Sequence, residues 1–170
     1  MNDQGAGMKS VKILVTGGTI DKVHDTFSEG LDFPKDGTSQ IPKILLDSRC
    51  HFADVQILMM KDSLDFDDAD RDAIVAAVEA AAEDAIVVTH GTGTMGESAR
   101  WLAARVTGKT VVFTGAMRPH SLSVSDGPFN LGGAMIAAQT LPAGVYGVMN
   151  GRVFEADHLT KNTAQGRFDL

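Results

Sequence analysis

The sequence predicts a doubly wound α/β domain, in which helices cover both faces of a mostly parallel sheet. Short apolar runs alternate along the chain with longer segments that have helical periodicity. The runs at 11–15 and 85–88 are apolar at nearly every position, as expected for strands that are buried on both faces. A chain of 170 residues, 44% of them hydrophobic and 22% charged, has room for one such domain.

Strands and helices are expected in alternation along the chain. The five strands are predicted at 11–15, 54–60, 85–88, 110–114 and 144–149, and the four helices at 39–48, 67–83, 95–106 and 128–140.

Residues at the helix ends support these limits. Ser39 is a favoured N-cap residue, and Pro42 fits the first turn that follows it. The acidic residues that open helix 67–83 complement its dipole. Gly108 is placed to end the third helix, and Asp126 to cap the fourth.

Three segments have no apolar periodicity. The polar stretch from Asp21 to Thr38 is unusually long for a loop in a compact domain, which predicts a lid or a binding loop. Residues 150–170 are polar with little pattern. Residues 1–8 predict a flexible tail in front of a single domain at 9–170.

The composition argues against several classes of protein. With a net charge of −7 and no basic stripe, the chain is not expected to bind nucleic acid. No apolar run reaches 18 residues and the first residues lack the blocks of a signal peptide, so we expect no membrane contact and a cytoplasmic location. Cys50 is the single cysteine, expected to be at least half-buried near a helix end.

Aspartates gather between Asp62 and Asp70. This pattern favours a solvated helix start, whose acids match the dipole, over a metal site. No pair of His or Cys residues has metal-ligand spacing, so neither a metal nor another cofactor is expected.

Two threonine-rich turns follow predicted strands, Thr16–Thr19 (TGGT) and Thr89–Thr94 (THGTGT). Loops at the carboxyl ends of parallel strands share one crevice, where glycine amides and threonine hydroxyls can surround a small polar or anionic molecule. A nucleotide- or phosphate-binding turn is a weaker alternative, because the G-x-G-x-x-G pattern and the Walker lysine are missing.

At these turns the sequence resembles the bacterial-type L-asparaginase/glutaminase family. Two further segments of that family, Gly115–Pro119 (GAMRP) and Asp126–Leu131 (DGPFNL), follow in order, and the resemblance spans residues 11 to about 163. It implies a flavodoxin-like fold that hydrolyses L-asparagine without a cofactor, with L-glutamine as a second candidate substrate. Family enzymes continue into a smaller C-terminal domain, so the chain resembles the short, single-domain members.

The resemblance implies that Thr19 is the nucleophile, beside the substrate-binding Gly18. From the residue alone, Thr19 could equally be a helix cap. The tyrosine that activates this threonine in the family has no counterpart in the following loop, because Tyr146 lies in a predicted strand. His24, in the comparable region, is the candidate base, and an exposed loop histidine is the alternative.

A second family triad of Thr, Asp and Lys is matched at Thr92, which Gly91 and Gly93 flank as substrate-binding candidates. Gly93 stands where the aspartate is expected. Alignment of the helix after Asn130 puts Thr140 or Leu141 near the expected lysine, so the sequence predicts that this lysine is absent.

A third family segment that contacts substrate falls near Lys61, Asp62 and Ser63. Asp62 and Ser63 are therefore substrate-binding candidates. Lys61 is a catalytic candidate that could supply Thr92 with the missing positive charge, and a surface Lys–Asp pair is the alternative.

The leading hypothesis is an amidohydrolase that converts L-asparagine to L-aspartate and ammonia through a threonine nucleophile. The alternative is a catalytically impaired binding module for asparagine, aspartate or a related small acid, which the two triad departures favour. A homo-oligomer, most simply a two-fold dimer, is expected to cover the crevice. Helices 95–106 and 128–140 would form the contact, so that Trp101 and Met135 are not exposed.

Overall fold

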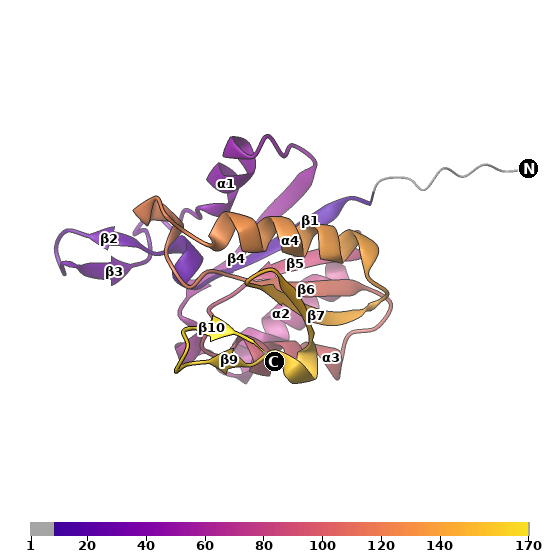
Figure 1. Cartoon of the computed structure of the whole chain (residues 1–170). Coiled ribbons are helices and arrows are strands. Elements are labelled where there is room, and N and C mark those ends of the chain that lie inside the picture. The colour runs from indigo at the N-terminus through magenta and orange to yellow at the C-terminus, as the bar shows by residue number, and fades with distance from the viewer. Residues whose placement is uncertain (1–8, 170) are drawn as a thin grey trace, which may run out of the picture.

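The computed structural model describes residues 9–169 and holds a six-stranded sheet between two layers of helices (Figure 1). The strands lie in the order β4-β1-β5-β6-β7-β8. Their bounds are β1 Val11–Gly17, β4 Ala53–Lys61, β5 Ala85–Thr89, β6 Thr110–Thr114, β7 Gly144–Met149 and β8 Arg152–Glu155. All neighbouring pairs are parallel except β7 and β8. The predicted fold class is confirmed, and the predicted tail at 1–8 lies outside the described residues.

In the described part of the chain, four helices cover the two faces of the sheet: α1 Ile41–Asp47, α2 Asp68–Ala80, α3 Met95–Ala103 and α4 Gly127–Thr140. Helices α1 and α4 share a core cluster in which Leu131 joins Ile13 of β1. Helices α2 and α3 share a second cluster, in which Leu102 joins Leu14 of β1. Because adjacent residues of β1 enter opposite clusters, the central residues Ile13–Val15 are all apolar.

Helix α2 begins with a reciprocal capping box. The Asp67 carboxylate accepts a hydrogen bond from the Asp70 N–H at 2.9 Å, and the Asp70 carboxylate accepts one from the Asp67 N–H at 2.9 Å. The acidic cluster is therefore a helix start, as the sequence predicted.

Helix α1 begins one residue later than expected. Gln40 is its N-cap residue, so the predicted position of Ser39 was wrong by one residue, although the Ser39 Oγ accepts the N–H of Ile41 at 3.0 Å. Asp21, which is fully buried, explains the difference: its Oδ1 accepts hydrogen bonds from the Ser39 hydroxyl and from the Gln40 N–H, both at 2.7 Å. Burial raises the pKa of Asp21. Cys50 follows α1 and is half-buried, as predicted.

The segment predicted as a lid or binding loop forms a two-stranded hairpin, β2 Val23–Asp25 with β3 Gly30–Asp32, which projects away from the two helical layers (Figure 1). It follows a single 3-10 turn at Thr19–Asp21. The base of the segment is fastened in two ways. Asp21, at its start, accepts hydrogen bonds from Ser39 and Gln40 just past its end. Nζ of the neighbouring Lys22 lies 2.6 Å from Oδ2 of Asp62.

The polar C-terminal residues form regular structure, although their sequence shows little pattern. They add strand β8, a 3-10 turn at Ala156–His158 and a small hairpin of β9 Lys161–Asn162 with β10 Arg167–Phe168. Phe168 is buried, with its ring centroid 6.3 Å from that of Phe154. Its N–H donates to Oδ1 of Asn150 at 2.9 Å, and the Asn150 N–H donates to Oδ1 of Asn130 on α4 at 3.0 Å.

Candidate active site

The two threonine-rich turns meet at the carboxyl edge of β1 and β5. Gly17 and Gly18 have φ values of +94° and +87°, a region that L side chains rarely adopt. A Cβ added to Gly18 would lie 2.5 Å from the backbone nitrogen of Gly91. The backbones of the turns are thus in direct contact, and this contact requires glycine at position 18.

Thr19 begins the 3-10 turn that follows Gly18 and is half-buried. Its carbonyl accepts the Lys22 N–H at 3.2 Å. Over residues 9–169, no hydrogen bond engages the Thr19 hydroxyl, so this group is open to a ligand at the edge of the two turns.

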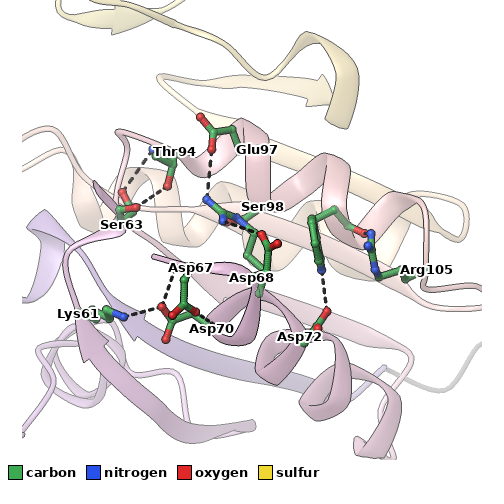
Figure 2. A network of polar contacts seen from close by, with 12 residues as sticks. Lys61, Ser63, Asp67, Asp68, Asp70, Asp72, Thr94, Glu97, Ser98 and Arg105 are labelled. Atoms are coloured by element: carbon green, nitrogen blue, oxygen red, sulfur yellow. Dashed lines mark hydrogen bonds and ion pairs between the residues drawn. The ribbon is translucent and has the colours of Figure 1, made fainter. Parts of the chain in front are cut away.

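Ser63 joins a third loop to the same place. It is buried in a 3-10 turn at Ser63–Asp65, and a Cβ added to Gly91 would overlap its Oγ. The Thr94 hydroxyl donates to the Ser63 carbonyl at 2.7 Å, and the Thr94 N–H donates to the Ser63 Oγ at 3.3 Å (Figure 2). The candidate residues Gly18, Gly91 and Ser63 therefore lie together.

Thr92 is in contact with a lysine, although the sequence predicted that none is present. Nζ of Lys161, on β9, donates to Oγ1 of Thr92 at 3.1 Å. The position proposed from the helix alignment was wrong: Thr140 lies in the last turn of α4, where its hydroxyl donates to the Ile136 carbonyl. Lys161 comes from the segment for which no pattern was seen.

Thr92 and Lys161 line a cleft of about 430 Å³ between α3 and the C-terminal hairpin. Its other lining residues are mostly polar or small, namely Gly93, Thr94, Gly96, Glu97, Arg100, Thr160 and Thr163, together with Leu64, Leu159 and Phe168. Residues 159–168, far along the chain from the turns, therefore build one wall of this cleft. The cleft meets the second turn at Thr92–Thr94, and Gly18 and Thr19 are not among its lining residues.

A sequence model described as the asparaginase N-terminal domain matches residues 10–169. The chain belongs to the asparaginase family. L-asparaginase 2 of Escherichia coli K12 is 44% identical over 82 residues, which are 46% of this chain and 24% of that protein. L-asparaginase 2 of Bacillus subtilis 168 is 43% identical over 82 residues, which are 46% of this chain and 22% of that protein.

Solved asparaginases share the fold over most of this chain. The probable cytoplasmic L-asparaginase of Campylobacter jejuni aligns with a TM-score of 0.73 and 28% identity, over 88% of this chain and 48% of that one. L-asparaginase I of Vibrio cholerae aligns with a TM-score of 0.76 and 26% identity, over 89% of this chain and 48% of that one. The asparaginase-family chain described here spans about half the length of these structures.

Lys61 does not reach Thr92. Its Nζ lies 2.5 Å from Oδ2 of Asp70 at the start of α2 (Figure 2). The bond to Asp70 raises the pKa of Lys61. The hypothesis that Lys61 supplies the charge beside Thr92 was wrong, and its alternative, a Lys–Asp pair at a helix start, is what the structure contains.

Asp62 and His24 lie at the edges of the site. The hydrogen bond from Lys22 lowers the pKa of Asp62, whose Oδ1 also accepts the Leu64 N–H at 3.0 Å. His24 lies on β2 and is exposed, and its imidazole makes no hydrogen bond within residues 9–169. The structure therefore places Asp62 next to Ser63 but does not bring His24 to Thr19.

His90 is a structural part of the second turn that the sequence did not single out. It is fully buried, and its Nδ1 lies 2.8 Å from the Gly91 carbonyl and its Nε2 2.9 Å from Oγ of Ser98. Since a carbonyl only accepts, Nδ1 carries the proton and Nε2 accepts from the serine. Burial lowers the pKa of His90 to about 4, so the ring is neutral and fixes the backbone that leads into Thr92.

Proposed function

We propose that this chain hydrolyses the side-chain amide of L-asparagine to L-aspartate and ammonia, with Thr19 as the nucleophile. The observation that carries the proposal is the contact of Lys161 with Thr92, at 3.1 Å, on the turn whose backbone touches that of Gly18. Family membership and the names of the relatives, which are L-asparaginases, support the same reaction.

In the proposed reaction the Thr19 oxygen attacks the amide carbon. The C–N bond breaks, the nitrogen leaves as ammonia after it takes a proton, and an ester with Thr19 remains. Water then hydrolyses the ester, which releases the carboxylate and restores the hydroxyl. Lys161 would stabilise negative charge that develops near Thr92, and the glycine amides of the turns are candidate donors to the carbonyl oxygen.

His24 is the proposed proton acceptor for Thr19. Because it is exposed on β2, this role requires the β2–β3 hairpin to fold over the turns. The variant His24→Gln should then lose most ammonia release while it keeps the melting temperature of the parent. Unchanged ammonia release would mean that another group accepts the proton of the Thr19 hydroxyl.

The main test measures ammonia release from L-asparagine and L-glutamine. Thr19→Ala should abolish it, because the proposed ester forms on the Thr19 oxygen, and Lys161→Met should lower it by about tenfold or more. Thr107→Ala, which removes an exposed hydroxyl ahead of β6, is the matched control and should be fully active. Ammonia release by the Thr19→Ala variant would refute the assignment of Thr19 as the nucleophile.

A binding module for asparagine, aspartate or a similar small acid is the second candidate. Gly93 favours it, because the residue that lines the cleft beside Thr92 has no side chain to take part in proton transfer. Aspartate would then raise the melting temperature of a chain that releases no ammonia.

We also propose that the chain forms a two-fold dimer through α4. This helix exposes Phe129 and Ile136, whose side chains are 68% and 62% exposed. Hollows of about 370 and 550 Å³ lie along its two sides and share Pro128, Gly132 and Ile136. A second copy suits this shape, because a two-fold axis lets the ridge of each helix enter a hollow of the other.

Trp101 and Met135, the residues that suggested a dimer from the sequence, already have partners within the single chain. Met135 is buried within the chain. The Trp101 indole N–H donates to Asp72 at 2.9 Å, and Cζ of Arg105 lies 3.7 Å from the centroid of its ring (Figure 2 labels Asp72 and Arg105). Sedimentation at micromolar concentration should find a dimer that Ile136→Glu converts to a monomer. A monomeric parent would refute the interface.

No helix within residues 9–169 is long and apolar enough to cross a membrane. The cytoplasmic location remains part of the proposal. It is supported by the similar C. jejuni protein, which is described as a probable cytoplasmic L-asparaginase.

A further inference from the structure

The cleft beside Thr92 carries an excess of unpaired positive charge. Arg100 and Lys161 both line it, and neither makes an ion pair within residues 9–169. The Lys161 amine has one hydrogen-bond partner in this part of the chain, the neutral hydroxyl of Thr92. A bound anion could therefore be attracted by two cations that no carboxylate of the described chain neutralises.

The carboxylates near the cleft are already engaged. Glu97 lines it, but its Oε2 lies 3.2 Å from Nη2 of Arg71, a buried cation (Figure 2 labels Glu97). Asp62 is held by Lys22 at 2.6 Å through one oxygen and by the Leu64 N–H through the other. Glu97 is the only carboxylate among the residues that line the cleft, so a ligand's ammonium group would find no unpaired carboxylate in that lining. Asp157 lies outside it, in a neighbouring hollow that also includes Lys161.

Gly93 is the position where a carboxylate could have been supplied. It lines the cleft next to Thr92, is exposed and does not have a positive φ, so its backbone accepts other residues. A Cβ added there would lie 2.7 Å from Cδ2 of Leu64, the far end of a side chain that is 73% exposed. Glycine is thus not required by the backbone conformation, and its effect is to leave the cleft wall next to Thr92 without a carboxylate.

We propose that the preferred substrate is an ω-amide of a dicarboxylic acid that has no free α-ammonium group, such as succinamate or an N-acylated asparagine. Its remaining carboxylate would pair with Lys161 or Arg100, and it brings no cation into a cleft that holds two. This inference rests on the proposed amide hydrolysis and deepens it by naming the substrate class. L-asparagine is then a substrate of the same reaction, but a poorer one.

The first experiment compares ammonia release from succinamate, N-acetyl-L-asparagine and L-asparagine at low salt. We expect kcat/KM for the first two to exceed that for L-asparagine by about tenfold or more, with a difference that shrinks as salt screens the charges. A preference for L-asparagine would overturn this proposal and leave the proposed hydrolysis intact.

Two variants of Gly93 isolate the charge. Gly93→Asp and Gly93→Asn have side chains of the same shape and displace Leu64 alike, so a difference between them reports the carboxylate. Relative to Gly93→Asn, Gly93→Asp should shift the preference towards L-asparagine by about tenfold. Equal preferences in the two variants, with melting temperatures that confirm both are folded, would overturn the proposal.

A binding experiment tests the preference for ligands without an ammonium group separately from hydrolysis. If the chain hydrolyses no amide, the proposed function fails, but this preference can still be measured. Succinate and L-aspartate differ in the ammonium group, and titration calorimetry of the unaltered chain can compare them directly. Succinate should bind about tenfold more tightly, and Arg100→Gln should weaken its binding. Aspartate that binds as tightly as succinate would overturn the inference.

Discussion

The contact between the two threonine-rich turns can be tested through Gly18→Ala. The added methyl group would lie 2.5 Å from the Gly91 nitrogen, at a residue whose φ is +87°. The backbone conformation, with a ψ of −178°, lies in a region essentially restricted to glycine and costs about 1–3 kcal/mol. The overlap costs about 1–2 kcal/mol, because the atoms it meets are backbone and cannot simply rotate away. The total is about 2–5 kcal/mol, which lowers the melting temperature of a domain of this size by roughly 5–15 °C.

Gly37→Ala is the matched control for this variant. Gly37 has a φ of +72°, but nothing lies within 4 Å of the position of its added Cβ. It should therefore lose only the conformational part, about 1–2 kcal/mol, and keep its ammonia release. Urea unfolding of both variants gives the difference in the free energy of unfolding. Equal losses in the two variants, with activity retained in both, would refute the contact on which the site is built.

Three further outcomes follow from the described contacts. Because burial lowers the pKa of His90 to about 4, the unfolded chain takes up a proton there before the folded chain does. Stability present above pH 6.5 should fall by roughly 3 kcal/mol towards pH 4, and His90→Gln, but not His51→Gln at an exposed position, should flatten this slope of unfolding free energy against pH. Lys61→Met should leave ammonia release unchanged where Lys161→Met lowers it; equal effects would contradict the assignment of Lys161 to Thr92. Phe168→Ala should cost about 3–5 kcal/mol in urea unfolding and also reduce activity, and full activity would separate the C-terminal hairpin from the site.

The sequence predicted those parts of the fold whose signal is periodic. Strand 144–149 was predicted to the residue, and the central strands were recognised because burial on both faces makes them apolar throughout. The end of α1 that was predicted wrongly depends on Asp21, a residue 18 positions away from its partner Ser39, and no local propensity records such a contact.

The candidate site was predicted where glycine and threonine mark it and missed where a distant segment completes it. Gly18, Gly91 and Ser63 do converge. Lys161 was missed because it is one lysine in a polar stretch, 69 residues from Thr92, and its position depends on two isolated apolar residues, Leu159 and Phe168, that are too few to give a periodic pattern. The presence of these two large apolar residues in a polar stretch is the signal that could have indicated an ordered segment.

Lys161, the lysine beside Thr92, belongs to the C-terminal hairpin, so its position depends on the thermal stability of that hairpin and not only on that of the sheet. It has two short strands, and its links to the rest of the domain include the ring of Phe168 and the amide contacts through Asn150 to α4. Local opening of such a segment has a lower free energy than unfolding of the six-stranded sheet. On heating, Lys161 would leave the site while the sheet is still intact, so the chain should be inactivated reversibly a few degrees below the temperature at which it unfolds.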